Sequence, residues 1–113
     1  MTFTALEQDV LNWIAKHSTN PAVARQVATA RPVAREYTGV GFFVDLEVDA
    51  DLPRVSFGVS PLDPAIISPQ LDCDGGSVLF FEGGLASMLE LYANGDTFPE
   101  EVESWELRDP RIP

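Results

Sequence analysis

The chain has 113 residues with 7 basic and 18 acidic side chains, so its formal net charge is −11 at pH 7 and its isoelectric point lies near 4.2. A chain of this size buries about two-thirds of its extended surface on folding, which is enough for one modest hydrophobic core. A hydrophobic fraction of 45% with 22% charged residues is typical of a globular protein and argues against disorder. We therefore expect a single domain over residues 1–113.

The acidic balance excludes several classes of partner. Nucleic-acid binding depends on Lys and Arg side chains that neutralise phosphates, and the only lysine is Lys16. An anionic membrane surface is disfavoured for the same reason, and no segment approaches the ~20 apolar residues of a membrane helix. The single cysteine, Cys73, cannot form an internal disulfide, and the N-terminal residues do not resemble a signal peptide. We expect a cytoplasmic protein.

The charge is distributed unevenly along the chain. Residues 1–38 contain four basic and three acidic side chains, whereas residues 39–113 contain three basic and fifteen acidic ones. The acidity therefore belongs to the C-terminal two-thirds, and a partner that binds there should be cationic.

The N-terminal part is predicted to form two helices. Thr4 followed by Glu7 matches a capping box, and apolar residues recur at helical spacing from there to about His17. Asn20 and Pro21 suit the N-cap and the first position of a second helix. That helix should end before the next proline, because the residue that precedes a proline avoids helical dihedral angles.

The pattern then changes to alternation, which indicates strands. A first strand is expected at residues 33–38 and a second at 40–48, with Val40, Phe42 and Val44 on its apolar face. Residues 55–59 alternate again, and we expect them to pair with 40–48 as a hairpin.

The second half is predicted to hold a loop, two further strands, a helix and a last strand. The double glycine Gly83-Gly84 should end a central strand, and the helical spacing of Leu85, Met88 and Leu89 predicts a third helix after it. The expected segments are a loop at 61–76 with a short strand at 66–67, a strand at 77–81, a helix at 85–92 and a strand at 102–108.

The predicted order is ααββββαβ. Helices and strands in this order with short connections are typical of an α+β domain. We expect a mainly antiparallel sheet of four to five strands whose one face is covered by helices.

The residues with the strongest claim to function lie on and just beyond the second strand. Alternate side chains of a strand point to the same side, so residues 43–51 should present one aromatic ring and a row of carboxylates ~7 Å apart. A solvated face, a docking surface for a basic partner and a hard-cation site all remain open for this row. The candidate partner-binding residues are Phe43, Asp45, Glu47, Asp49 and Asp51.

Catalytic, metal and cofactor signatures are weak. Calcium loops need a glycine and a later bidentate glutamate, which the acidic strand lacks, and zinc sites need several Cys or His. Cys73 lies between two aspartates that oppose thiolate formation, so we expect it to be a small, at least half-buried structural residue. His17 falls at the predicted end of the first helix, where its cationic form suits the helix dipole. No catalytic residue, cofactor or metal is expected.

Parts of the sequence resemble a family of short bacterial proteins of unassigned function. The likeness lies in residues 36–45, residues 76–81, Leu85 and residues 89–92, about half of the chain at motif level. It implies a bacterial cytosolic setting, and it implies no activity, cofactor or catalytic residue.

Two hypotheses of function follow. The first is a non-enzymatic module that binds a basic protein through the acidic strand, similar in composition to immunity proteins that neutralise basic toxins. The second is a small ligand-binding domain or enzyme with a pocket between helices and sheet, near Tyr37, Tyr92 and Trp105. Homo-oligomerisation through an open sheet edge is also left open.

Overall fold

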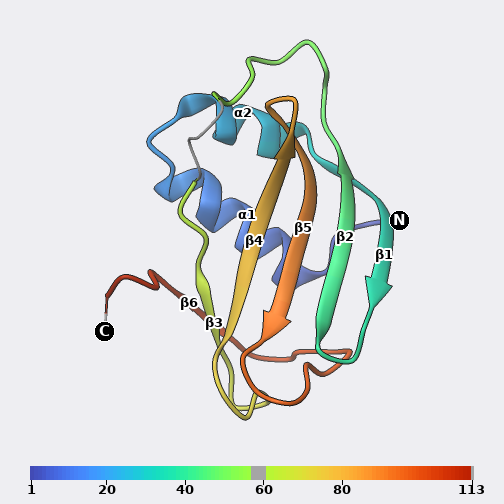
Figure 1. Cartoon of the computed structure of the whole chain (residues 1–113), viewed down its shortest axis with the longest axis vertical. Helices are drawn as coiled ribbons and strands as arrows, with labels where there is room; N and C mark the ends of the chain where they lie inside the picture. The colour runs from blue at the N-terminus through green and yellow to red at the C-terminus, as the bar shows by residue number, and fades with distance from the viewer. Residues whose placement is uncertain (57–60, 113) are drawn as a thin grey trace.

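Two helices lie on one side of a six-stranded antiparallel sheet (Figure 1). The computed structural model describes residues 1–56 and 61–112. The elements are α1 (Ala5–His17), α2 (Pro21–Thr29), β1 (Arg31–Tyr37), β2 (Gly41–Glu47), β3 (Ala65–Ile67), β4 (Gly75–Glu82), β5 (Leu85–Ala93) and β6 (Glu106–Arg108). The sheet order is β1-β2-β5-β4-β3-β6. The predicted α+β class is confirmed, and the radius of gyration of 13.5 Å is close to the about 13 Å expected of a compact single domain of this length.

Both helices begin where the sequence predicts. The Thr4 amide donates to Glu7 Oε1 at 2.9 Å and the Glu7 amide donates to Thr4 Oγ1 at 3.2 Å, which completes the capping box. Asn20 caps α2 by accepting from the Ala22 amide at 3.0 Å, and Pro21 occupies the first turn. Neither of these described helices is long and apolar enough to cross a membrane.

The core lies between the helices and the inner face of the sheet. Its best-buried members, all at most 1% exposed, are Val10, Leu11, Ile14, Val23, Val44, Ile66, Leu89, Leu91 and Phe98. Each such side chain contributes about 1.5–3 kcal/mol when it is fully removed from water. The packing of α1 and α2 on the sheet therefore supplies most of the stability of helices that are too short to persist alone.

The predicted third helix is wrong, because residues 85–93 form β5. Gly83 and Gly84 both have positive φ, at 60° and 83°, and they join paired residues Glu82 and Leu85. Two consecutive residues with φ > 0 between antiparallel strands form the two-residue hairpin turn that matches strand twist. The long β4–β5 ladder that follows satisfies the backbone of this segment and outweighs its helical spacing. The element order is therefore ααββββββ.

The predicted hairpin between residues 40–48 and 55–59 is also wrong. Both edges of β2 are occupied, by β1 on one side and by β5 on the other. The Val55 amide donates instead to the Gly84 carbonyl at 2.8 Å, while residues 57–60 lie outside the described part. Val40, predicted on the apolar face, is 51% exposed because it precedes β2 in the turn from β1.

The last strand is shorter than predicted. Only residues 106–108 pair, with β3, and the preceding segment is held by side chains. Gln70 Oε1 accepts from the Glu103 amide at 2.5 Å, and Ser68 Oγ donates to the Ser104 carbonyl at 2.7 Å. These bonds satisfy backbone groups of residues 103 and 104 without a neighbouring strand. Residues 98–105 therefore cross the end of the sheet without joining it.

A half-buried aspartate, Asp63, accepts a hydrogen bond from the backbone of β4. Asp63 Oδ1 accepts from the Leu79 amide at 3.1 Å. Burial raises the pKa of Asp63 to about 6, although the hydrogen bond from Leu79 opposes the shift. Since the folded chain holds this proton more tightly than the unfolded chain, stability is lost as the pH rises from the ordinary Asp pKa of 3.8 to about 6, and the loss is complete above that pH.

Asp63→Asn is therefore expected to stabilise the protein at pH 8. The asparagine oxygen still accepts from the Leu79 amide, and the substitution removes the negative charge from this half-buried position. We expect a gain of about 1 kcal/mol over the wild type, reduced by solvent contact with the side chain, and a smaller gain at pH 5, where folded Asp63 is mostly protonated. Urea denaturation at both pH values measures the difference, and the exposed Asp51→Asn change serves as the control. An equal gain at the two pH values would contradict the argument.

Candidate functional site

The sheet has a face that no helix covers. Residues opposite each other on antiparallel strands share a face, and the inner row of Val44, Leu89 and Leu79 marks the side toward the helices. The neighbours of these residues along each strand point the other way, and we call them the outer face. The outer face includes Arg31, Ala34, Glu36, Phe43, Asp45, Glu47, Val78, Phe80, Met88, Glu90 and Tyr92. In Figure 1 it is the side turned away from α1 and α2.

Phe43 lies at the centre of the outer face. It is half-buried and pairs with Glu36 on β1 and Glu90 on β5. Asp45 is exposed and pairs with Ala34 and Met88. A shallow hollow of about 530 Å³ lies over this part of the sheet, lined by Ala34, Arg35, Glu36, Phe43, Asp45 and Met88. The outer face therefore has an apolar centre with carboxylates directly beside it.

The predicted row of carboxylates is only partly present. Asp45 and Glu47 are exposed on the outer face, but Glu47 makes a loose ion pair with Arg31 at 3.9 Å. Asp49 and Asp51 lie beyond the end of β2, where Asp49 Oδ1 accepts from the Asp51 amide at 2.9 Å and stabilises a turn. The structure thus keeps Phe43 and Asp45 together and places the last two aspartates in the turn.

Two further carboxylates join Phe43 through the tertiary structure. Glu36 and Glu90 flank it across the strands although they lie 54 positions apart in the sequence. Alternation within β1 places Glu36 on the face opposite Arg35, which could have been read from the sequence. The position of Glu90 beside Phe43 does not follow from the sequence pattern, because residues 85–92 have the spacing of a helix.

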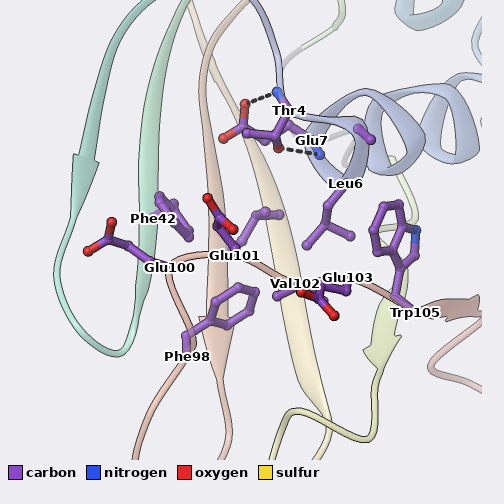
Figure 2. A pocket seen from close by; sticks show the side chains of 12 residues that line it. Thr4, Leu6, Glu7, Phe42, Phe98, Glu100, Glu101, Val102, Glu103 and Trp105 are labelled. Carbon is purple, nitrogen blue, oxygen red and sulfur yellow. Dashed lines mark hydrogen bonds between the residues drawn. The ribbon is translucent and has the colours of Figure 1, made fainter.

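A pocket of about 350 Å³ lies on the other side of the sheet, between the first turn of α1 and the segment that follows β5 (Figure 2). Most of the residues that line it are apolar or are glutamates. The members are Thr4, Ala5, Leu6, Glu7, Phe42, Leu91, Phe98, Glu100, Glu101, Val102, Glu103 and Trp105. Of the three residues predicted to mark such a pocket only Trp105 lines it. Tyr37 does not line the pocket, but its hydroxyl donates to the carbonyl of Phe98, which does. Tyr92 lies on the opposite side of the sheet.

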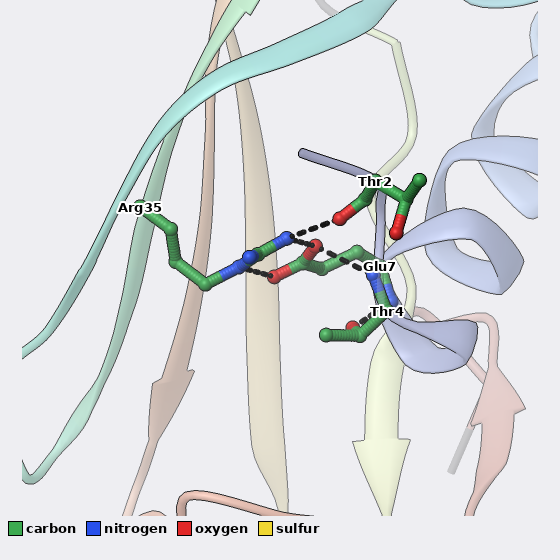
Figure 3. Close-up of polar contacts among 4 residues, drawn as sticks. All are labelled: Thr2, Thr4, Glu7 and Arg35. Carbon is green, nitrogen blue, oxygen red and sulfur yellow. Dashed lines mark hydrogen bonds and ion pairs between the residues drawn. The ribbon is translucent and has the colours of Figure 1, made fainter.

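A buried ion pair fixes the wall of this pocket (Figure 3). Arg35 turns inward from β1, donating from Nε to Glu7 Oε2 at 2.8 Å and from a terminal nitrogen to Glu7 Oε1 at 2.5 Å. The same guanidinium donates to the Thr2 carbonyl at 2.9 Å. The side chain of Glu7 is 1% exposed, and its hydrogen bond raises the pKa of Arg35. The pair attaches the start of α1 to the sheet.

The remaining candidate groups are not assembled into a reactive centre in the described residues. Cys73 is exposed, which corrects the prediction that it is at least half-buried. Its exposure follows from the loop position of residues 72–74. His17 ends α1 as predicted and stacks on Trp13 with ring centroids 3.7 Å apart. Within residues 1–56 and 61–112, no three His, Cys, Asp or Glu side chains are placed to hold a metal ion.

No protein-family model, no curated protein and no solved structure matches the chain. Function is therefore inferred from the outer face of the sheet and from the pocket beside α1.

Proposed function

We propose that the protein is a non-enzymatic cytoplasmic module that binds a basic protein through its outer face. One observation carries this proposal: the uncovered side of the sheet places an aromatic side chain, Phe43, between carboxylates. Interfaces commonly pair a buried aromatic anchor with a charged rim. In acidic composition alone the chain is similar to immunity proteins that neutralise basic toxins, so a protein of that class is one form of this proposal.

The charges on the outer face are available to a partner. Among the described residues, which include every Lys and Arg of the chain, Glu36, Asp45 and Glu90 make no ion pair. Arg35, the cation nearest in sequence, is committed to Glu7 on the inner side. A cationic partner would therefore meet uncompensated negative potential, which raises association rates and excludes acidic competitors.

A standard-sized interface would occupy only a small part of the molecular surface. A standard interface takes about 800 Å² from each partner, and the whole molecule exposes 6396 Å². A second copy of the chain is a poor occupant, because two molecules of charge −11 would bring like charges together.

Charge reversal around Phe43 is expected to abolish partner capture. The variant Glu36→Lys, Asp45→Lys, Glu90→Lys inverts the potential beside the anchor. The variant Asp45→Lys, Glu47→Lys, Asp49→Lys should have a smaller effect, because Glu47 is already paired and Asp49 lies in the turn. Affinity purification from the native host, followed by mass spectrometry, measures capture, and the captured protein should be basic and released by salt.

The matched control changes the same charge on the other side of the sheet. The variant Glu100→Lys, Glu101→Lys, Glu103→Lys should keep partner capture, since these residues line the pocket and not the outer face. Circular dichroism checks that each variant is folded. Wild-type capture by the outer-face variant, or loss of capture in the control alone, would overturn the proposal.

The pocket favours a second candidate function, the binding of a small ligand. Its volume of about 350 Å³ lies at the lower end of the range for small-molecule sites.

A further inference from the structure

The pocket between α1 and residues 98–105 has a closed apolar base and a partly open apolar wall. Leu91 and Phe98 are at most 1% exposed and form the base, and Phe42 is 9% exposed beside them. Val102 and Trp105 are half-buried on the wall that faces α1. A volume of about 350 Å³ equals that of roughly twelve water molecules, which leaves room for a ligand of about ten non-hydrogen atoms.

Every charged residue that lines the pocket is acidic. Glu100, Glu101 and Glu103 are exposed along one wall, and no lining residue is basic. Among the described residues none of these three glutamates makes an ion pair. Figure 2 shows the Glu101 side chain pointing into the space between Phe42 and Leu6. The fourth glutamate, Glu7, is already neutralised by Arg35.

Aromatic rings complete the lining. The Trp105 indole N–H donates to Asp9 Oδ2 at 2.8 Å, which holds the ring in place beside the glutamates. Phe42 and Phe98 meet edge to face, with centroids 5.8 Å apart and planes at 88°. Aromatic faces attract organic cations, and the attraction grows where water is excluded.

The start of α1 also borders the pocket, and a helix N-terminus favours anions. The capping box already uses the amides of Thr4 and Glu7, however, and the pocket lining includes three glutamates that make no ion pair among the described residues. An anionic ligand would have to approach these carboxylates, so the charge balance favours a cation.

We propose that this pocket binds a small organic cation, an ammonium group on an apolar body of about ten non-hydrogen atoms. The ammonium group lies beside Glu101 and Glu103, and the apolar body packs against Phe42, Val102 and Trp105. The site is independent of the outer face, because it lies on the opposite side of the sheet.

The test uses the full chain and three probes of similar shape: 2-phenylethylammonium, the neutral 2-phenylethanol and the anionic 3-phenylpropanoate. The chain contains two tryptophans, so NMR can follow their indole N–H signals separately during titration. Trp105 lines the pocket and Trp13 does not. The ammonium probe should shift the Trp105 signal saturably, leave the Trp13 signal in place, and bind at least tenfold more tightly than the anion.

Glu101→Gln should weaken binding of the ammonium probe about fivefold, since it removes one partly exposed charge contact. Glu82→Gln makes the same change of charge at the exposed β4–β5 turn and should leave affinity unchanged. Both glutamates are exposed, so both variants should fold. The outer-face variant Glu36→Lys, Asp45→Lys, Glu90→Lys should bind the probe like the wild type if it is folded.

Three outcomes would overturn the inference. One is binding of the anion as tightly as the cation, which would assign the site to the amides of α1. Another is an unchanged affinity in Glu101→Gln. The third is the absence of a saturable Trp105 shift with the ammonium probe at millimolar concentration. None of these outcomes affects partner capture by the outer face, so the two proposals fail separately.

Discussion

Replacement of Gln26 by leucine is expected to lower the free energy of unfolding by about 3 kcal/mol. The Gln26 side chain is 0% exposed and makes three hydrogen bonds to backbone groups that no helix or ladder satisfies. Its Nε2 donates to the carbonyls of Pro53 and Gly84, both at 2.9 Å, and its Oε1 accepts from the Ala86 amide at 2.9 Å. Leucine fills the same space but leaves the buried Ala86 amide without a partner and removes the donor to the Pro53 carbonyl. The Gly84 carbonyl keeps its hydrogen bond from the Val55 amide.

Urea denaturation measures the loss, and thermal unfolding should show a fall of roughly 10 °C in Tm for a domain of this size. Gln8→Leu is the matched control. Gln8 lies exposed on α1 and its side chain bonds only to Asn12, so its replacement should change stability by less than about 0.5 kcal/mol. Similar losses in the two variants would show that Gln26 does not connect α2, the loop before residue 57 and the β4–β5 turn as described.

Arg35→Met is expected to cost about 3 kcal/mol, because it leaves the buried Glu7 carboxylate without its cation. The loss should be largely recovered in the double variant Glu7→Gln, Arg35→Met. A glutamine at position 7 carries no charge and can still accept from the Thr4 amide, as a capping box allows. The coupling between the two positions in a double-mutant cycle should therefore be at least about 1 kcal/mol.

The matched control is Arg31→Met, which breaks the exposed pair with Glu47. That pair spans 3.9 Å and both side chains are mostly in water, so its removal should cost no more than about 0.5 kcal/mol. Additive effects at positions 7 and 35 would contradict a buried pair between them. A broken pair should also loosen the start of α1 and with it one wall of the pocket.

The sequence was most informative where local chemistry decides the structure. Thr4, Glu7, Asn20 and Pro21 specify the helix starts by hydrogen bonds and backbone angles within four residues, and these predictions are confirmed. Alternation predicted β2 to within one residue at each end. Strands at β1, β3 and β4 were also expected, and their ends lie within two residues of the predicted ones. Such features need no knowledge of what packs against them.

The segment after Gly83-Gly84 shows where local patterns fail. Leu85, Met88 and Leu89 fit a helical face, yet Leu89 points to the core and Met88 to the outer face of a strand. The double glycine was itself a hairpin signal, and its two positive φ angles bring β5 back along β4. A ladder between distant residues then supplies hydrogen bonds that a short window of sequence cannot reveal.

Local sequence patterns are enough to predict the acidic character, the two capped helices, the α+β class and the placement of Phe43 and Asp45 on one strand. Folding of the whole chain brings Glu36 and Glu90 beside Phe43, pairs Arg35 with Glu7, and closes a pocket between residues 98–105 and α1. Alternation and capping act between near neighbours, so they specify the first group of features. The composition of a surface or a cavity depends on strand order and on contacts between residues that are far apart in the chain.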